Sequence, residues 1–169
     1  MGGKPAAITR QHAADTELAA DADALVLESF VPYRLSVLSN RISQRIADVY
    51  AERFGIGVTE WRVIAVLGRF PGLSAADVAE RTAMDKVAVS RALARLLQRG
   101  LLLRDTADED RRRSVLALSP AGRAVHAEVA PLALRIEARL LARLDAGERH
   151  HLQRLLDKLE RGIPAIGED

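Results

Sequence analysis

The sequence predicts a mainly α-helical fold with one small β-hairpin, on the strength of three observations. Apolar residues repeat at three- and four-residue spacings over most of the chain, as they do in amphipathic helices. Two short apolar runs flank a charged segment at residues 105–113, as the strands of a hairpin do. The 169 residues include six Pro and eleven Gly, which leaves room for long helices. We expect one domain with a hydrophobic core.

Composition excludes several kinds of site. The chain has no Cys, which excludes disulfides, thiolate metal sites and thiol redox switches. The four His lack a cluster of Cys or Glu at ligand spacing, so we expect no metal and no cofactor. The N-terminus lacks the apolar core of a signal peptide, and no stretch approaches the roughly 20 apolar residues of a membrane span. We therefore expect a cytoplasmic protein.

Charge is distributed unevenly, although the formal net charge is +2. Residues 1–30 contain two basic and five acidic side chains, whereas residues 85–123 contain nine basic and five acidic ones. An anionic partner is therefore expected to bind the middle of the chain.

The first predicted elements are an arm and two helices. Residues 1–24 have no sustained apolar stripe and predict a flexible arm or a short helix. A long amphipathic helix is predicted from an N-cap at Ser29 to Phe54, with its apolar stripe formed by Leu35, Leu38, Ile42, Ile46, Val49 and Tyr50. A second helix is predicted from Thr59 until Pro71, with inward positions at Trp61, Ile64, Ala65 and Leu67.

Two shorter helices follow. Ser74 begins the first, with Asp77 three residues later in a capping-box arrangement, and this helix ends near Thr82. Asp85 caps the second, which reaches Arg99 and is followed by a Gly that suits a left-handed terminator. Two helices joined by a turn of three or four residues form the helix-turn-helix pattern.

A hairpin and two helices complete the chain. Residues 101–104 and 114–118 predict the strands of the hairpin. A long helix opens at Ser119, with Pro at its first position, and runs to about Leu144. Asp145 caps the last helix, whose apolar stripe is too continuous to face water and predicts a partner helix in a homodimer: Leu152, Leu155, Leu156, Leu159 and Ile163.

The helix that Asp85 caps has a cationic face. Its buried stripe of Val89, Leu93 and Leu96 leaves the opposite face to Val87, Arg91, Arg95 and Gln98. Free backbone N–H groups near its N-terminus also favour phosphate. Such a face on an isolated helix is most simply a solvated surface, whereas beside a basic hairpin it suits the DNA major groove. The DNA contacts expected from the two short helices are Ser74, Lys86, Ala88, Ser90, Arg91 and Arg95.

The hairpin loop adds a second cationic cluster, Arg111, Arg112 and Arg113, next to Asp108, Glu109 and Asp110. A solubilising turn with internal ion pairs is one interpretation. The other is a wing, because arginine at a hairpin tip suits a narrow minor groove, where negative potential is enhanced. Helix and hairpin together predict a winged helix-turn-helix that binds double-stranded DNA.

The resemblance to a known family is specific at this point. The DNA-binding lobe of MarR-family transcriptional regulators resembles residues 73–123, LSAADVAERTAMDKVAVSRALARLLQRGLLLRDTADEDRRRSVLALSPAGR. The segment ERFGIGVTEWRVIAVL resembles the family's second helix and its entry. The flanking helices correspond to the family's dimerisation region, so that the resemblance covers roughly residues 29–162. Asp110 and Arg112 match the family's Asp-x-Arg wing pattern. An Asp that the family often has at the start of the wing loop falls on Ala107 here, with Asp108 next to it.

The resemblance implies an architecture and a function. It implies that Asp110 orients Arg112 toward the minor groove, as a carboxylate can hold a guanidinium. After the arm, the expected parts are an N-terminal dimerisation helix at 25–57, a winged helix-turn-helix lobe at 58–118 and C-terminal dimerisation helices at 119–169. The expected function is a sequence-specific, ligand-responsive repressor that binds a pseudo-palindromic operator as a homodimer.

The resemblance also implies a small effector, aromatic and anionic, bound between the dimerisation helices and the lobe. Candidate contacts are aromatic walls and guanidinium donors: Tyr33, Arg34, Trp61 and Arg62. In the alternative interpretation, Trp61 fills the core and the two arginines pair with acids such as Glu28 and Glu60.

Two other classes of function stay open. One is a winged-helix module that binds proteins, or DNA without sequence preference. The other is an enzyme acting on small aromatic molecules, for which the sequence offers no Gly-x-Ser-x-Gly elbow and no convincing nucleophile–base pair. We therefore predict a regulator without catalytic residues.

Overall fold

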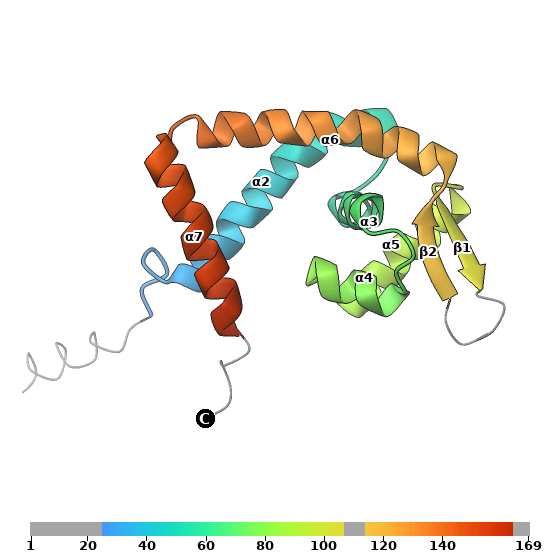
Figure 1. Cartoon of the computed structure of the whole chain (residues 1–169), viewed down its shortest axis with the longest axis horizontal. Helices are drawn as coiled ribbons and strands as arrows, with labels where there is room; N and C mark the ends of the chain where they lie inside the picture. Colours follow the sequence, from blue (N-terminus) through green and yellow to red (C-terminus); the bar gives the residue numbers. More distant parts are fainter. Residues whose placement is uncertain (1–24, 107–113, 164–169) are drawn as a thin grey trace, which may run out of the picture. The chain divides into compact units, whose positions relative to one another are not determined.

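The computed structural model describes residues 25–106 and 114–163, and it confirms the predicted fold class (Figure 1). In chain order the elements are α2 (Val31–Phe54), α3 (Val58–Arg69), α4 (Ala75–Thr82), α5 (Lys86–Gln98), β1 (Leu102–Thr106), β2 (Ser114–Leu118), α6 (Pro120–Leu141) and α7 (Ala146–Gly162). Among the helices of this described part, none combines the length and apolarity that crossing a membrane requires. Where we expected one domain, the chain divides within α2 into two compact units, Met1–Ile42 and Ser43–Asp169.

The start of α2 differs from the prediction. The predicted N-cap at Ser29 is wrong, because its hydroxyl donates backward to the Val26 carbonyl (3.1 Å) in the preceding turn. The helix begins at Val31, and the Phe30 carbonyl accepts a hydrogen bond from the Arg34 N–H (3.1 Å). A hydroxyl at a helix entry can bond to either side, and the sequence does not say which.

Only part of the predicted α2 stripe is buried. Tyr50 is 1% exposed, and Ile42 and Ile46 are half buried. The other three predicted inward positions lie exposed on the single chain: Leu35, Leu38 and Val49.

α3 begins one residue before the predicted Thr59, because Gly57 is its N-cap and the Glu60 carboxylate accepts a hydrogen bond from the Gly57 N–H (2.6 Å). Its buried positions follow the i, i+3, i+4, i+7 pattern from Glu60, namely Val63, Ile64 and Leu67. Ala65 and Trp61, predicted to face inward, are half buried because they flank that stripe. Glu60 is a buried carboxylate that the sequence did not predict.

The helix-turn-helix caps are confirmed. The Ser74 hydroxyl accepts a hydrogen bond from the Asp77 N–H (3.2 Å), while the Asp77 carboxylate accepts one from the Ser74 N–H (2.9 Å). The Asp85 carboxylate accepts hydrogen bonds from two N–H groups in the first turn of α5. Ala83 takes a left-handed conformation (φ 49°) between the helices, and Gly100 does so (φ 67°) after α5.

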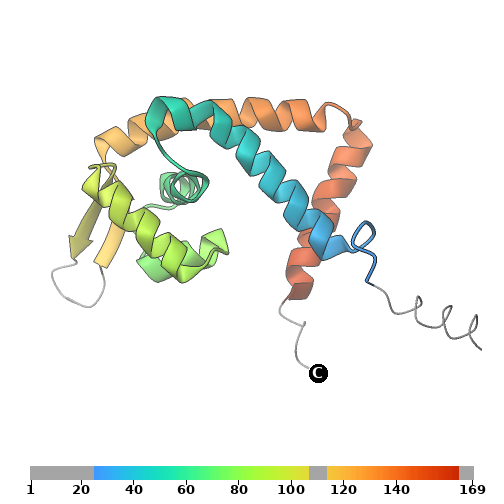
Figure 2. The ribbon, with the colours of Figure 1, turned by 180° about the vertical axis from the view of Figure 1, so that it is seen from behind.

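β1 and β2 form the predicted antiparallel hairpin, with Leu102 opposite Leu118. β1 extends to Thr106, so that Asp105, predicted in the loop, pairs with Val115 instead. The residues before α4 also join the hairpin, since the Leu116 N–H donates to the Leu73 carbonyl (2.8 Å). Figure 2 shows α4, α5 and the hairpin grouped at one end of the second unit. The hairpin is therefore bonded to the segment that begins the helix-turn-helix.

α6 is shorter at its C-terminus than predicted. It begins after the predicted N-cap Ser119 and ends at Leu141 rather than near Leu144. Beyond this end, the Arg149 Nε donates to the carbonyls of Leu141 and Leu144 (3.0 Å each) and so satisfies two carbonyl groups at the C-terminus of the helix.

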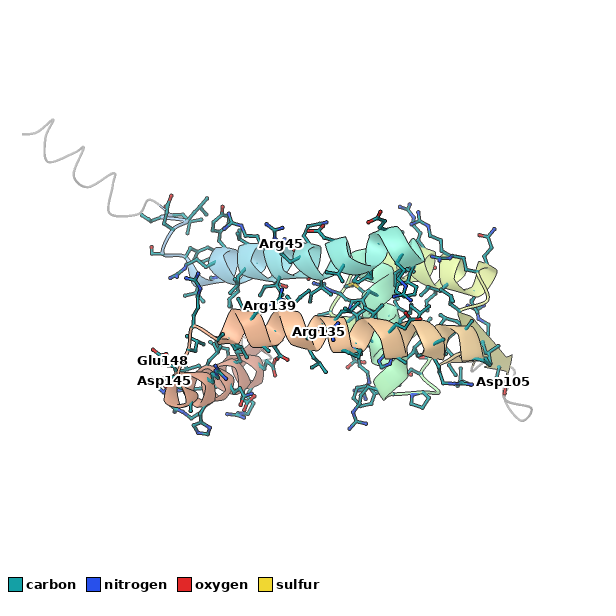
Figure 3. The ribbon with its side chains drawn as sticks, turned by 90° about the horizontal axis from the view of Figure 1, so that it is seen from above. Arg45, Asp105, Arg135, Arg139, Asp145 and Glu148 are labelled. Carbon is teal, nitrogen blue, oxygen red and sulfur yellow. The ribbon has the colours of Figure 1, made fainter. Side chains whose placement is uncertain are left out.

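α7 begins after the predicted cap. Figure 3 labels Asp145 and Glu148 at its start, where the Glu148 N–H donates to the Asp145 carboxylate (2.8 Å) and the Asp145 N–H donates to the Glu148 carboxylate (2.9 Å). No residue of α7 is buried within the described chain. The whole predicted stripe is exposed, from 38% at Leu152 to 61% at Ile163.

The core of the second unit surrounds α3. This helix lies against α4, α5, α6 and β2. The fully buried side chains of the core come from α3 and from the elements around it: Tyr50, Ile56, Val63, Ile64, Leu67, Val78, Val89, Leu96, Leu116 and Val129. α5 is therefore held on a packed scaffold by its apolar face.

Candidate nucleic-acid interface

α5 has one buried and one exposed face. Its buried positions are Val89, Ala92, Leu93 and Leu96. The exposed positions are Lys86, Val87, Ser90, Arg91, Ala94, Arg95 and Gln98, while Ala88 is half buried. The structure therefore places four of the six predicted contacts of the helix-turn-helix on an open surface of one helix.

The exposed face of α5 is cationic and free of acids. The helix contains Lys86, Arg91 and Arg95 and no Asp or Glu. Arg45 pairs with Asp48 and Arg53 with Glu128, and neither ion pair involves α5. No ion pair within residues 25–106 and 114–163 is recorded for these three cations.

The N-terminus of α5 is less open to phosphate than the sequence suggested. The Val87 and Ala88 N–H groups both donate to the Asp85 carboxylate (3.0 Å each). An acidic side chain at this end also offsets the positive end of the helix dipole. Any attraction of an anion to α5 must therefore come mainly from its side chains.

Ser74 is engaged within the protein. Its hydroxyl donates to the Asp77 carboxylate (2.7 Å) and also accepts from the Asp77 backbone, and the residue is half buried. A contact from Ser74 to DNA stays a prediction.

Arg99 is a positioning residue that the sequence did not identify. At the C-terminal end of α5, its guanidinium donates to the carbonyl oxygens of Gly55 (2.9 Å) and Phe54 (2.5 Å), at the C-terminal end of α2. A cation at a helix C-terminus also interacts favourably with the negative end of the helix dipole. The partners are 44 and 45 residues away in sequence, so no local pattern could reveal them. Arg99 fixes the end of α5 to the end of α2.

The base of the hairpin is fixed by Ser119. This residue is 4% exposed, and its hydroxyl donates to the Gly100 carbonyl (2.6 Å) while accepting from the Gly122 N–H (3.0 Å). The Arg123 guanidinium donates to the Leu118 carbonyl (2.8 Å). The start of α6 is thereby bonded to both ends of the hairpin.

The predicted wing contacts lie outside the described residues. These are Asp110, Arg111, Arg112 and Arg113. The N-terminal arm at residues 1–24 lies outside them too. Their roles stay predictions.

Two candidate effector contacts belong to the first unit. Tyr33 is 44% exposed, and with Arg34 it lines a hollow of about 580 Å³ on α2, shared with Val31, Leu35, Val37, Leu38 and Arg41. An aromatic ring and two guanidinium groups thus border an otherwise apolar hollow.

The other two candidates belong to the second unit. Trp61 packs against the core, with ring centroids 5.8 Å from Tyr50 and 5.9 Å from His126. The Arg62 guanidinium donates to the Ser43 hydroxyl (2.8 Å). Burial raises the pKa of Tyr50 to about 12, with the charge of Glu60 acting in the same direction and that of Arg62 opposing it. The surroundings of Trp61 favour the core interpretation for that ring.

Comparisons with known sequences return regulators of transcription. A family model described as "MarR family" matches residues 54–113. A protein named as a candidate transcriptional regulator for the hcr operon of Thauera aromatica is 33% identical over 107 residues. That match spans 62% of this chain and 64% of the relative, which is less than two thirds of the relative's length. An HTH-type transcriptional repressor of Mycobacterium tuberculosis is 29% identical over 131 residues, 77% of this chain and 91% of the repressor.

Solved structures with the same fold are regulators as well. A MarR/EmrR family regulator from Acinetobacter sp. ADP1 superposes with a TM-score of 0.77 at 26% identity, covering 84% of this chain and 100% of that one. BpsR from Bordetella bronchiseptica, described in terms of regulation of its DNA binding by 6-hydroxynicotinic acid, superposes with a TM-score of 0.62 at 28% identity. That alignment covers 75% of this chain and 98% of BpsR.

Proposed function

The chain belongs to the MarR family of transcriptional regulators, and from this premise we propose that it is a cytoplasmic, homodimeric repressor of a pseudo-palindromic operator. The observation that supports DNA recognition most strongly is the acid-free cationic face of α5, fixed by a buried apolar face and by Arg99. We assign α5 to the major groove, with Lys86, Ser90, Arg91 and Arg95 as its contacts. Arg112 is assigned to the adjacent minor groove, oriented by Asp110.

The proposed dimer rests on exposed apolar side chains. The stripe on α7 is uncovered along its length, and α2 exposes Leu35, Leu38 and Val49. Contiguous apolar surfaces of this kind mark interaction sites. We accordingly keep 25–57 and 119–169 as dimerisation regions and 58–118 as the DNA-binding lobe. A two-fold dimer places two copies of α5 on half-sites about 34 to 36 Å apart.

In vitro selection of duplex DNA tests this function. We expect an inverted repeat whose half-sites are centred about one helical turn apart, a footprint covering both, and a dimer by light scattering at the concentration used for binding. Tight and specific binding by a monomer would contradict the dimer. Binding without any preferred sequence would favour the nonspecific architectural role instead.

We further propose that a small aromatic carboxylate reduces DNA binding. BpsR, at 28% identity, supports this proposal through its regulation by 6-hydroxynicotinic acid. Arg34 beside Tyr33, or Arg62 beside Trp61, would bind the carboxylate. Because an effector acts through its differential affinity for two states, DNA must weaken effector binding by the same factor by which the effector weakens DNA binding.

Titration calorimetry with benzoate and with 6-hydroxynicotinate, in the presence and absence of operator DNA, tests this reciprocity. We expect weaker effector binding in Arg34→Ala or in Arg62→Ala, because each removes a guanidinium donor. Arg45→Ala is the matched control, since the Arg45 side chain on α2 is 82% exposed and pairs with Asp48 at 3.8 Å. Binding that responds neither to these mutations nor to DNA would remove all four residues from the effector proposal.

A further inference from the structure

One exposed apolar side chain interrupts the cationic face of α5. Val87 is 55% exposed, whereas the other Val and Leu side chains of this helix are buried or half buried. It is not part of the core cluster. A β-branched residue is also a weaker helix former than Ala or Leu. Neither packing nor helix propensity therefore explains a valine at this position.

The position of Val87 places it among the cations. Val87 and Arg91 are four residues apart, so that they lie one above the other on the same side of α5. Lys86 and Ser90 flank them and are also exposed. The Val87 N–H donates to the Asp85 carboxylate (3.0 Å), which fixes the backbone that presents the side chain.

The chemistry of the major groove restricts what Val87 can contact. Base edges there present hydrogen-bond donors and acceptors, together with one apolar group, the C5-methyl of thymine. An apolar side chain pressed against a donor or acceptor leaves that group desolvated and without a partner. We therefore propose that Val87 contacts a thymine methyl and selects thymine at one position of each half-site. This inference rests on the proposed placement of α5 in the major groove.

Arg91 locates that thymine within the half-site. Four helical residues span about 6 Å along the axis, and stacked base pairs are about 3.4 Å apart. The thymine contacted by Val87 therefore lies within about two base pairs of the base contacted by Arg91. Since arginine most often pairs with guanine in the major groove, the half-site contains a thymine and a guanine at this short separation.

Replacing thymine by deoxyuridine tests the inference, because the two bases differ by that methyl group alone. In the selected operator, each thymine is replaced in turn at symmetric positions of both half-sites. We expect the wild-type protein to lose about three- to fivefold in affinity per methyl at one position of each half-site. Val87→Ala should bind the thymine operator more weakly by a similar factor and should bind the two operators equally.

Gln98→Ala is the matched control, since Gln98 is exposed on α5 at its other end. It should retain the full sensitivity to deoxyuridine, and neither variant should melt at a lower temperature than wild type. Specific binding in which wild type and Val87→Ala respond identically to every deoxyuridine would overturn the inference while the proposed function stands. Absence of sequence-specific binding by wild type would overturn both.

Discussion

Gly122→Ala is expected to destabilise the protein by about 3 kcal/mol or more, the upper end of the usual cost of overpacking. Gly122 is buried in the first turn of α6, and a Cβ added there would lie 2.0 Å from the Leu101 carbonyl oxygen. The obstacle is backbone, and that carbonyl also accepts a hydrogen bond from the Ser119 N–H (3.0 Å). The start of α6 would have to move away from the hairpin. Thermal unfolding should show a fall in Tm of about 6 to 12 °C.

Two other glycines serve as controls for Gly122→Ala. A Cβ at Gly162 has no atom within 4 Å, so Gly162→Ala should be neutral or stabilising by up to about 1 kcal/mol. A Cβ at Gly68 would lie 2.6 Å from the His126 ring, a side chain that can shift, so Gly68→Ala should fall between the two. A Tm for Gly122→Ala within about 2 °C of wild type would show that the contact between α6 and the hairpin is looser than described.

Arg91→Ala is expected to lower affinity for the operator by about 1 to 3 kcal/mol, or roughly five- to 150-fold, and to relax preference at one base. Arg91 is exposed on the acid-free face of α5, so the mutation leaves the core intact. Arg112→Ala should also lower affinity, with altered preference confined to A·T-rich flanking steps, because its proposed contact is the minor groove. Fluorescence anisotropy across a panel of operator variants measures both effects.

The salt dependence of binding separates base contacts from phosphate contacts. Each lost phosphate contact should flatten the slope of log affinity against log salt by about 0.9. Lys86 is exposed at the start of α5, where we expect it to contact phosphate, so Lys86→Ala should flatten the slope with little change in base preference. Arg139→Ala, which removes an exposed cation on α6 (Figure 3), should leave base preference unchanged.

Equal affinities for wild type, Arg91→Ala and Arg112→Ala would refute the assignment of both arginines.

Local sequence signals predicted the ends of most helices well. The caps at Ser74, Asp85, Ser119 and Asp145 are all confirmed, because a cap depends on residues within one turn of the helix end. The buried stripe of α5 is confirmed for the same reason, since helical periodicity alone decides which side chains lie opposite the cations.

Long-range contacts account for most of what the sequence did not predict. Arg99 bonds to carbonyls 44 and 45 residues away, and the hydroxyl of Ser119 to a carbonyl 19 residues away. The carbonyls at the end of α6 accept hydrogen bonds from Arg149 in the next helix. Apolar periodicity in α2 and α7 predicted faces that need covering, but a single chain leaves those faces exposed. A periodic pattern gives the direction of burial and not the identity of the partner.

We propose that the exposed face of α5 contacts base edges in the major groove. Replacing each operator guanine in turn by 7-deazaguanine removes one acceptor from that groove and leaves base pairing intact. If Arg91 contacts guanine, wild type should lose about tenfold in affinity at one guanine per half-site. Arg91→Ala should show no further loss at that guanine. The same loss in both proteins at every guanine, or no loss at any of them, would contradict the claim.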